Sequence, residues 1–408
     1  MRTDACGRRF NTRCRPHRCP GSGSHCLRCA CNGGRARERR AQSVVLRRQV
    51  SLSGGNWRGG RALGTSRFEV LLRCFLFVRR SWRPAGKNGV TGIGFGTWSW
   101  GNQLLWGYDP DRDDPELAQT LEVAAQGGLS LVDTADSYGT GRFNGRSEAL
   151  LGAILRARDP TLRSRLTVAT KLAPFPWRLG RRGFDRAFDA SQERLAGQLQ
   201  RVQLHWSTAR YAPWQEGPLL DGLADLVERG RVAELGVSNL GPKRLRALHA
   251  RLAARGVPLR SVQVQLSLLA PDAIQSAGLK SVCAELGIDL LAYSPLALGV
   301  LAVAPGATPP ACTQLRSRLF RRLLPASDGL RQCMASIAQE RQVSQAQVAL
   351  NWCRSHGAMP LPGLRRVHQA RDAVAALAWM LSDGERQDLD GLALDCRTRM
   401  PANPFMSA

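Results

Sequence analysis

Three polar side chains stand at the ends of short apolar runs, where acid–base chemistry is possible. Lys171 ends the run LTVATKL and is one of only four lysines in a chain rich in arginine. A compact ammonium group, paired with a carboxylate such as Asp133, could lie against the phenol of Tyr138 and draw its pKa down from about 10. Such a phenol is a general acid suited to protonating an alkoxide. These residues alone leave open the alternative of a structural ion pair beneath a loop.

His205 adds a candidate hydrogen-bonding group from a further run. It lies near the end of RVQLHW, next to Trp206. Most buried strand histidines only satisfy hydrogen bonds of the core, but an imidazole at a strand end can also orient a substrate oxygen. Four polar groups that converge from three runs favour a catalytic site over a chance arrangement.

The elements that would position these groups are eight β-rich runs, which alternate with helical patterns. This alternation is typical of a parallel sheet with crossover helices. Eight such units in roughly 300 residues predict a (β/α)8 TIM barrel, since that fold needs about 250 residues plus insertions. The runs are residues 90–98, 129–136, 166–172, 201–206, 232–239, 261–269, 288–296 and 358–364.

Polar residues at or just after the ends of these runs agree with a barrel, because barrel chemistry takes place at the carboxyl ends of the strands. They are Asp133, Asp136, Lys171, His205, Ser238, Asn239, Gln263, Gln265, Tyr293 and Ser294. A doubly wound open sheet is the alternative, suggested by GIGFG at residues 92–96. The sequence TWSWGN that follows does not begin a helix, so this glycine pattern is weak.

The helical patterns cover residues 115–126, 147–158, 217–229, 242–255 and 273–286. Three of them stop at Gly230, Gly256 and Gly287, which predicts left-handed caps at their carboxyl ends.

The formal net charge of +26 is concentrated at one end of the chain. Residues 1–90 hold 21 Lys and Arg against 3 Asp and Glu, which leaves a net charge of +8 for the rest. A body with that modest excess needs no polyanion, so a nucleic-acid or membrane-surface function rests on the leader alone. We predict that residues 1–85 form a disordered organelle transit peptide, since they are rich in Arg, Ser and Gly and poor in acid. An upstream artefact is the alternative reading.

Neither a metal site nor a membrane span is predicted. The segment HCLRCAC at residues 25–31 contains a C-x-x-C pair, but no second pair follows at zinc-finger spacing. The apolar stretch at residues 70–78 is interrupted by Arg73 and is far shorter than the ~20 residues of a membrane helix.

Seven motifs, in this order, resemble the aldo-keto reductase family. They are DTADSYG, GRSEALLG, ATKL, LHW, GVSN, AYSPL and PLPG, and the resemblance runs from about residue 92 to residue 390. It implies a (β/α)8 barrel over residues 86–395, followed by a C-terminal tail at residues 396–408. It further implies hydride transfer from NADPH to a carbonyl carbon, with Tyr138 donating the proton. The implied catalytic tetrad is Asp133, Tyr138, Lys171 and His205.

The resemblance also implies a cofactor site without a Rossmann fold. Ser238, Asn239 and Gln263 would hold the nicotinamide carboxamide, and Tyr293 would stack on the ring. Arg365 would contact the 2′-phosphate of NADPH, a role that the neighbouring Arg366 could share, because guanidinium groups suit phosphate. The remaining residues assigned to the cofactor are Trp98, Ser294, Leu296 and Gln369.

Three segments depart from the family pattern. Residues 299–310 read GVLAVAPGATPP, where the family usually carries a glycine-lysine-tyrosine run. Ala373 stands where the family often has an asparagine at the adenine end. The approach to the fourth strand is a residue or two shorter than usual, and a shifted register would turn His205 to the other face.

The resemblance implies that the partner is a small-molecule aldehyde, with pyridoxal, reduced to pyridoxine, as the leading substrate. Trp98, Trp100, Trp106 and Trp206 could line a pocket for a flat pyridine ring or could belong to the core. Another aldehyde and a cofactor-sensing regulatory subunit are the alternatives, because a shared barrel does not fix the substrate. The resemblance implies that the organelle is a plastid, so the leader is expected to be a plastid transit peptide and the location the chloroplast stroma, or the cytoplasm if the leader is an artefact. The sequence does not predict an oligomeric state.

Overall fold

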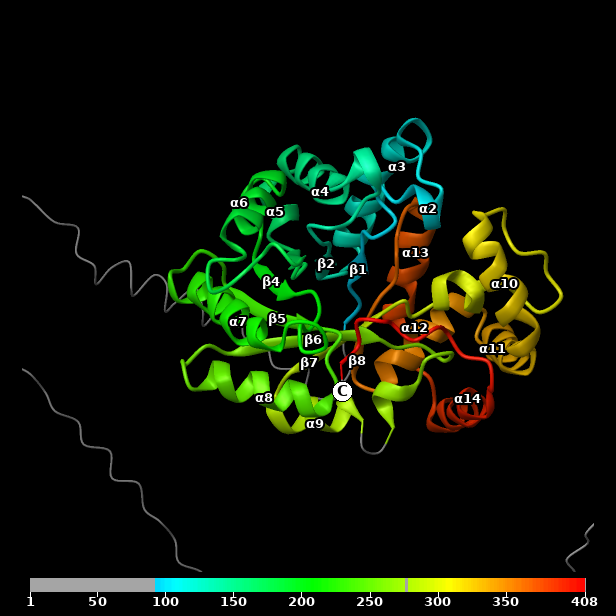
Figure 1. Cartoon of the computed structure of the whole chain (residues 1–408). Coiled ribbons are helices and arrows are strands. Elements are labelled where there is room, and N and C mark those ends of the chain that lie inside the picture. Colours follow the sequence, from blue (N-terminus) through cyan, green and yellow to red (C-terminus); the bar gives the residue numbers. More distant parts are fainter. Residues whose placement is uncertain (1–91, 276–277, 408) are drawn as a thin grey trace, which may run out of the picture. The chain divides into compact units, whose positions relative to one another are not determined.

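The computed structural model describes residues 92–275 and 278–407. Eight parallel strands follow one another in chain order around one sheet (Figure 1). The first and last strand segments meet where Gly94 N donates to Pro360 O at 3.1 Å and Gly96 N donates to Pro362 O at 2.9 Å. The predicted (β/α)8 barrel is therefore confirmed. Its strands are β1 Phe95–Gly96, β2 Leu131–Asp133, β3 Thr167–Leu172, β4 Arg201–Leu204, β5 Glu234–Ser238, β6 Leu259–Gln265, β7 Asp289–Tyr293 and β8 Ala358–Leu361.

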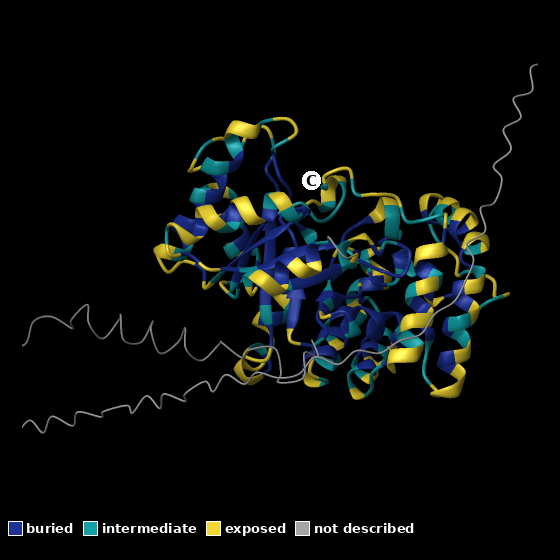
Figure 2. Cartoon of the chain, turned by 90° about the horizontal axis from the view of Figure 1, so that it is seen from below, coloured by how far each residue is buried: buried dark blue, intermediate teal, exposed yellow. Residues whose placement is uncertain are grey.

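Helices lie around the strands, with their exposed faces outward and their buried faces against the sheet (Figure 2). The α-helices are α2 Gln103–Trp106, α3 Pro110–Gln126, α4 Arg146–Arg156, α5 Pro160–Arg163, α6 Asp185–Arg194, α7 Pro213–Glu228, α8 Pro242–Ala253, α9 Leu279–Leu286, α10 Gln314–Ala326, α11 Asp328–Glu340, α12 Gln345–Ser355, α13 Val367–Ala375 and α14 Asp383–Asp395. Short 3-10 turns are η1 Gly141–Phe143, η2 Asp272–Ile274, η3 Ala297–Ala302 and η4 Ala376–Ala378.

The helix ends follow local chemistry. Gly230, Gly256 and Gly287 have φ angles of 67°, 72° and 66°, so the predicted left-handed caps are confirmed. Helix α3 begins five residues earlier than predicted, because the side chain of Asp109 accepts a hydrogen bond from Asp111 N and a proline fits the first turn. The predicted helix at residues 273–286 is wrong in its first part, since α9 begins at Leu279.

The barrel interior explains how the strands present polar groups. A small apolar cluster of Leu131, Ala169, Leu291 and Leu361 is separate from the large core cluster. Side chains two residues apart on a strand point the same way. Asp133, Lys171 and Tyr293 each lie two residues after a member of this cluster. They therefore form a polar layer above it, at the carboxyl end of the barrel.

Several sequence predictions concern residues outside the described ones. The boundary predicted between residues 85 and 86, the leader and the C-x-x-C segment all lie there. Across residues 92–275 and 278–407, no helix has the length and apolar character that a membrane crossing needs.

The C-terminal segment after α14 returns to the carboxyl ends of the strands. Met400 N donates to Leu269 O at 2.9 Å, and Ser407 N donates to Asn239 O at 3.1 Å. Ser407 also pairs with Leu240 in an isolated parallel bridge. The segment predicted only as a tail thus covers the end of the barrel where the polar layer lies.

Candidate active site

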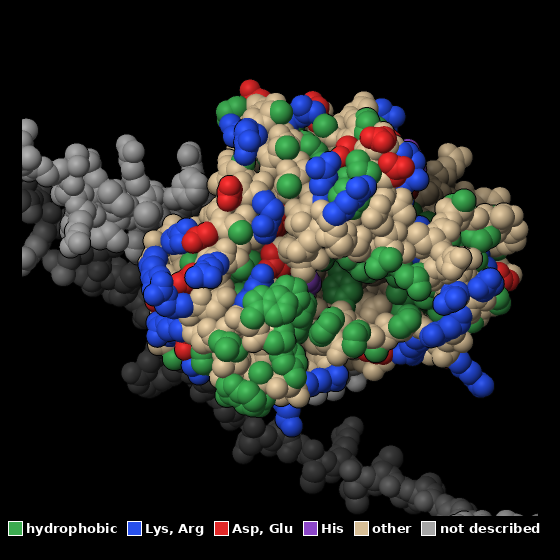
Figure 3. All heavy atoms as spheres, turned by 45° about the horizontal axis from the view of Figure 1, so that its top comes forward, with side chains coloured by type: hydrophobic (Ala, Val, Ile, Leu, Met, Phe, Trp, Pro, Cys, Tyr) green, Lys and Arg blue, Asp and Glu red, His purple; other side chains and the backbone are tan. Residues whose placement is uncertain are grey.

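A cavity of about 730 Å³ opens at the carboxyl ends of the strands. Figure 3 shows a hollow with hydrophobic side chains gathered along its rim. Apart from Arg366, all residues predicted for catalysis or cofactor binding line this cavity. They are Trp98, Asp133, Tyr138, Lys171, His205, Ser238, Asn239, Gln263, Tyr293, Ser294, Leu296, Arg365 and Gln369. The structure brings the predicted residues together, while the role of each stays a prediction.

Lys171 is the centre of a buried polar cluster. Its Nζ donates to Asp133 Oδ2 at 2.5 Å, to Tyr138 Oη at 3.0 Å and to Thr134 O at 2.8 Å. These three acceptors match the three donors of an ammonium group. Burial is the largest single effect on Lys171 and opposes its charge, but the charges and hydrogen bonds of Asp133 and Tyr138 together outweigh it, so the pKa of Lys171 is raised. The lysine therefore keeps its positive charge beside the phenol.

Asp133 is held by two amides as well as by the lysine. Gln203 Nε2 and Gln263 Nε2 each donate to Asp133 Oδ1 at 2.9 Å. Both glutamines are buried, and they stand on β4 and β6, while Asp133 stands on β2. Gln203 was not predicted from the sequence, although it lies two residues before His205 and so shares its face. Gln263 uses its amide nitrogen here, which leaves its amide oxygen for any other partner.

The pKa of Tyr138 differs from the sequence expectation. Burial raises it above the usual value for tyrosine, and the positive charge of Lys171 opposes this rise without reversing it. The expectation of a net lowering is wrong, because the loss of water around the phenolate outweighs the attraction of the ammonium group. Tyr138 consequently remains protonated at neutral pH, as a proton donor must.

The loop after β2 fixes the position of Tyr138. Tyr138 N donates to Ala135 O at 3.1 Å, and Gly145 N donates to Tyr138 O at 2.9 Å. The next residue, Gly139, has a φ of +115°, and a Cβ there would lie 1.8 Å from Phe143 O. Only glycine fits this position, so the glycine in the motif DTADSYG holds the turn that presents the phenol.

His205 faces the cavity, so the shorter approach to β4 does not turn it away. Its backbone N donates to Leu172 O at 3.1 Å, and its ring lies 5.9 Å from that of Tyr138, centroid to centroid. Burial, together with the positive charges of Lys171 and Arg178, holds the pKa of His205 well below its usual value. The ring is therefore neutral at pH 7. Its Nδ1 lies 3.3 Å from Ser137 Oγ.

A second group of hydrogen bonds surrounds Asn239. Its backbone is left-handed, with a φ of 59°, and its Nδ2 donates to His205 O at 3.0 Å. Ser238 Oγ donates to Gln263 O at 3.0 Å. Tyr293 Oη donates to Asn239 Oδ1 at 2.9 Å. The predicted carboxamide-binding side chains thus belong to one network.

The C-terminal segment reaches into this network. Asn403 Nδ2 donates to Asn239 Oδ1 at 3.1 Å and lies 2.7 Å from Tyr293 Oη. Phe405 stacks on Trp206 with ring centroids 4.3 Å apart. Sequence reasoning missed both residues, because no strand or motif marks the segment.

Of the four tryptophans considered for a pocket that binds a pyridine ring, three line the cavity and one belongs to the core. Trp98, Trp106 and Trp206 line the cavity. Trp100 is fully buried, and its Nε1 donates to Leu364 O at 2.7 Å. It belongs to the core.

Two arginines flank Trp106 at one part of the cavity wall. The guanidinium carbons of Arg316 and Arg365 lie 4.6 Å and 5.7 Å from the centroid of the Trp106 ring. The nearest carboxylate oxygen to Arg365 belongs to Asp113, at 3.9 Å. Arg316 forms no ion pair with the carboxylates of the described residues, and burial lowers the pKa of both arginines. Positive charge at this wall is incompletely neutralised.

Arg366 does not line the cavity. Its Nη2 lies 2.6 Å from Asp113 Oδ1 and its Nη1 lies 3.3 Å from Glu116 Oε2. The suggestion that it shares the phosphate role is not supported, because these carboxylates already hold it. Arg316 was missed in a chain crowded with arginine. The sequence feature that could have identified Arg316 is its position four residues before Phe320, which places both side chains on the buried face of one helix.

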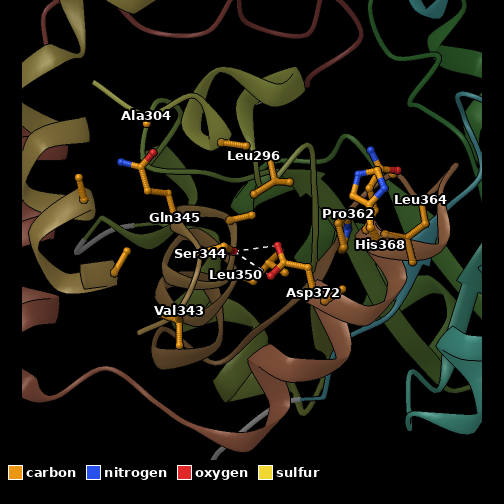
Figure 4. A pocket seen from close by; sticks show the side chains of 17 residues that line it. Leu296, Ala304, Val343, Ser344, Gln345, Leu350, Pro362, Leu364, His368 and Asp372 are labelled. Atoms are coloured by element: carbon orange, nitrogen blue, oxygen red, sulfur yellow. Dashed lines mark hydrogen bonds between the residues drawn. The ribbon is translucent and has the colours of Figure 1, made fainter. Parts of the chain in front are cut away.

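A smaller cavity of about 530 Å³ adjoins the first (Figure 4). The two share wall residues that include Leu296, Pro362 and Gln369. Ser344 Oγ donates to the two carboxylate oxygens of Asp372 at 2.9 Å and 2.7 Å. Ala373 lies on the same wall, where its small side chain leaves space. Across the described residues, no group of three or more His, Cys, Asp or Glu side chains is arranged to hold a metal ion.

Comparisons with known proteins agree with this geometry. The model of the aldo/keto reductase family matches residues 92–393. The chain is 46% identical over 325 residues to "Pyridoxal reductase, chloroplastic" of Arabidopsis thaliana, which covers 79% of this chain and 88% of the relative. It is 30% identical over 300 residues to 6-dehydroglucose reductase of Novosphingobium aromaticivorans, which covers 71% and 88% of the two chains.

Solved structures show the same fold. An aldo/keto reductase from Klebsiella pneumoniae in complex with NADP and acetate matches with a TM-score of 0.58 at 25% identity, over 78% of this chain and 96% of that chain. The glycerol dehydrogenase of Gluconobacter oxydans matches with a TM-score of 0.60 at 23% identity, with the same coverage. The chain therefore belongs to the aldo/keto reductase family.

Proposed function

We propose that the chain reduces the aldehyde of pyridoxal to the alcohol of pyridoxine, with NADPH as the reductant. The observation that carries this proposal is the buried contact of Lys171 Nζ with both Asp133 and Tyr138, at 2.5 Å and 3.0 Å, in a cavity that His205 also lines. A neutral phenol held against an ammonium group can deliver a proton and then stabilise the phenolate that remains.

The residues of the two adjoining cavities suit an extended dinucleotide. Ser238, Asn239 and Gln263 would hold the nicotinamide carboxamide in the larger cavity. The phosphates would lie against Arg316 and Arg365, where Arg316 Nε and Trp106 Nε1 are buried without a hydrogen-bond partner. Buried donors without partners are rare in native proteins, so their presence beside two arginines supports an anion at this wall. The adenosine would enter the smaller cavity near Gln369 and Asp372.

Bound NADPH would supply a hydride to the carbonyl carbon. Tyr138 Oη donates its proton to the carbonyl oxygen, so that the aldehyde becomes a primary alcohol. Lys171 stabilises the negative charge that develops on the phenol oxygen, and Asp133 keeps Lys171 charged and in place. His205, neutral at pH 7, hydrogen-bonds the carbonyl oxygen and directs it toward Tyr138.

Pyridoxal fits the aromatic character of the cavity. Trp98 lies 6.4 Å from the ring of Tyr138, and the stacked pair of Trp206 and Phe405 lies on the wall with His205. Flat rings bind well against such faces. The relative from Arabidopsis thaliana, named as a chloroplastic pyridoxal reductase, supports the same substrate.

Purified full-length chain, mixed with NADPH and a panel of aldehydes, tests the proposal through the fall in NADPH absorbance. We expect a higher kcat/KM for pyridoxal than for benzaldehyde or 4-nitrobenzaldehyde, with pyridoxine as the product. Equal or lower values for pyridoxal would reject the substrate, and no oxidation with any aldehyde would reject the reductase function. Arg316→Leu and Arg365→Leu should each weaken NADPH binding more than NADH binding if one of them holds the 2′-phosphate. An equal loss for both cofactors would place the arginines at the shared pyrophosphate.

We also propose that the protein acts in the plastid after removal of its leader. Support comes from the Arg-rich, acid-poor composition of residues 1–85 and from the chloroplastic relative. Amino-terminal sequencing of the protein from its native cells should find a start near residue 86. An intact Met1 would contradict the proposal.

A further inference from the structure

The side chain of Ser137 contacts the imidazole ring of His205. Ser137 Oγ lies 3.3 Å from His205 Nδ1, and no other hydrogen bond reaches this ring from the side chains or backbone that the structure describes. Both residues line the larger cavity. Ser137 stands directly before Tyr138, so the loop that presents the phenol also presents this hydroxyl group.

A neutral imidazole carries its proton on one nitrogen and a lone pair on the other. If the proton is on Nδ1, the nitrogen left for the cavity is Nε2, which can only accept a hydrogen bond. A carbonyl oxygen also only accepts, so that tautomer cannot bind it. If the proton is on Nε2, the ring can donate to the carbonyl oxygen. The lone pair on Nδ1 then needs a donor.

Ser137 is the donor that can satisfy this lone pair. Burying a nitrogen acceptor without a partner is unfavourable, so without the serine the useful tautomer would be disfavoured. The other groups near the ring do not replace it: the ring of Trp206 lies 4.9 Å from that of His205, centroid to centroid, and Trp206 Nε1 donates to Tyr211 Oη.

We infer that Ser137 is a positioning residue, which donates a hydrogen bond to His205 Nδ1 and so holds the ring as the Nε2–H tautomer that binds the substrate carbonyl. The inference rests on the proposed reduction at Tyr138. It assigns to the serine an action through His205 and no contact with the substrate.

Kinetics of the full-length chain with NADPH and pyridoxal provide the first test. Ser137→Ala should lower kcat about tenfold, which is the effect of one lost hydrogen bond. The dissociation constant of NADPH should change less than twofold. Ser137→Thr keeps the hydroxyl group and should stay within about threefold of the wild-type kcat. An alanine variant with the wild-type rate would overturn the inference.

A double-mutant cycle separates action through the histidine from direct action on the substrate. In a His205→Ala background, Ser137→Ala should change kcat less than twofold, because the ring it orients is gone. The same loss in both backgrounds would mean that the serine acts on the substrate itself and would overturn the inference. This result does not depend on whether the threonine variant folds.

The tautomer can also be observed without any turnover. In ¹⁵N-labelled chain, the ring signals of His205, assigned by their absence in His205→Ala, should show a protonated Nε2 and an unprotonated Nδ1. Ser137→Ala should shift the ring toward Nδ1–H. A protonated Nδ1 in the wild type would refute the inference even if pyridoxal is reduced. A protonated Nε2 would support it even if the substrate proves to be another aldehyde.

Discussion

Replacing Lys171 with methionine tests the electrostatic basis of the proton transfer. Methionine has a similar length and no charge, so Tyr138 keeps its surroundings but loses the ammonium group at 3.0 Å. Proton donation leaves a negative charge on the phenol oxygen. The variant should therefore slow the reaction in proportion to the charge that has developed in the transition state.

The size of the effect follows from Coulomb's law. Two unit charges at 3.0 Å attract by about 5 kcal/mol at an effective dielectric constant of about 20. With about half a charge on the oxygen in the transition state, the loss is roughly 2 to 3 kcal/mol. This corresponds to a fall in kcat of roughly 30- to 160-fold.

The same change leaves Asp133 as an uncompensated buried carboxylate, which destabilises the fold by roughly 3 to 5 kcal/mol. The matched variant Lys171→Met with Asp133→Asn removes both charges and should recover most of that stability. It should not recover the rate. Single-turnover NADPH oxidation at pH 7, with NADPH binding measured by fluorescence, gives the comparison. A folded double variant that binds NADPH and reacts within fivefold of the wild type would refute the electrostatic role of Lys171.

Three further outcomes can be measured without turnover. The chain has four tyrosines, and the pKa of each is raised, that of Tyr108 and that of Tyr293 to about 12. Phenolate absorbance should therefore appear only above pH 10. An ionisation below that pH would contradict the burial argument. Unfolding in guanidinium should return all four pKa values to about 10. Asn403→Ala should tighten NADPH binding severalfold, since its bond to Asn239 no longer has to break; weaker binding would make Asn403 a cofactor ligand.

The alternation of strand residues made most of the site predictable. Lys171, His205 and Tyr293 stand at or just after strand ends, and inward-facing positions recur every second residue. Once eight strands were recognised, their carboxyl ends had to meet around one opening. The ordered family motifs then supplied the cofactor residues, and all of them except Arg366 line the larger cavity.

Features set by tertiary packing could not be predicted in the same way. The pKa of Tyr138 depends on how much water the fold excludes, which the composition of a loop does not show. Arg316 lies on a helix inside a long connection after β7, and its closeness to Trp106 joins segments far apart in the chain. Asn403 reaches the cavity from a segment without periodic pattern.

The central claim is that Tyr138 gives its proton to the substrate carbonyl, and Tyr138→Phe tests it most directly. The variant removes the hydroxyl group and keeps the ring, so the cavity should retain its shape. We predict that pyridoxal-dependent NADPH oxidation at pH 7 falls at least 100-fold, while the dissociation constant of NADPH changes less than twofold. A variant that reduces pyridoxal at the wild-type rate would contradict the claim, and loss of NADPH binding would show that Tyr138 acts in the structure of the site and not as its acid.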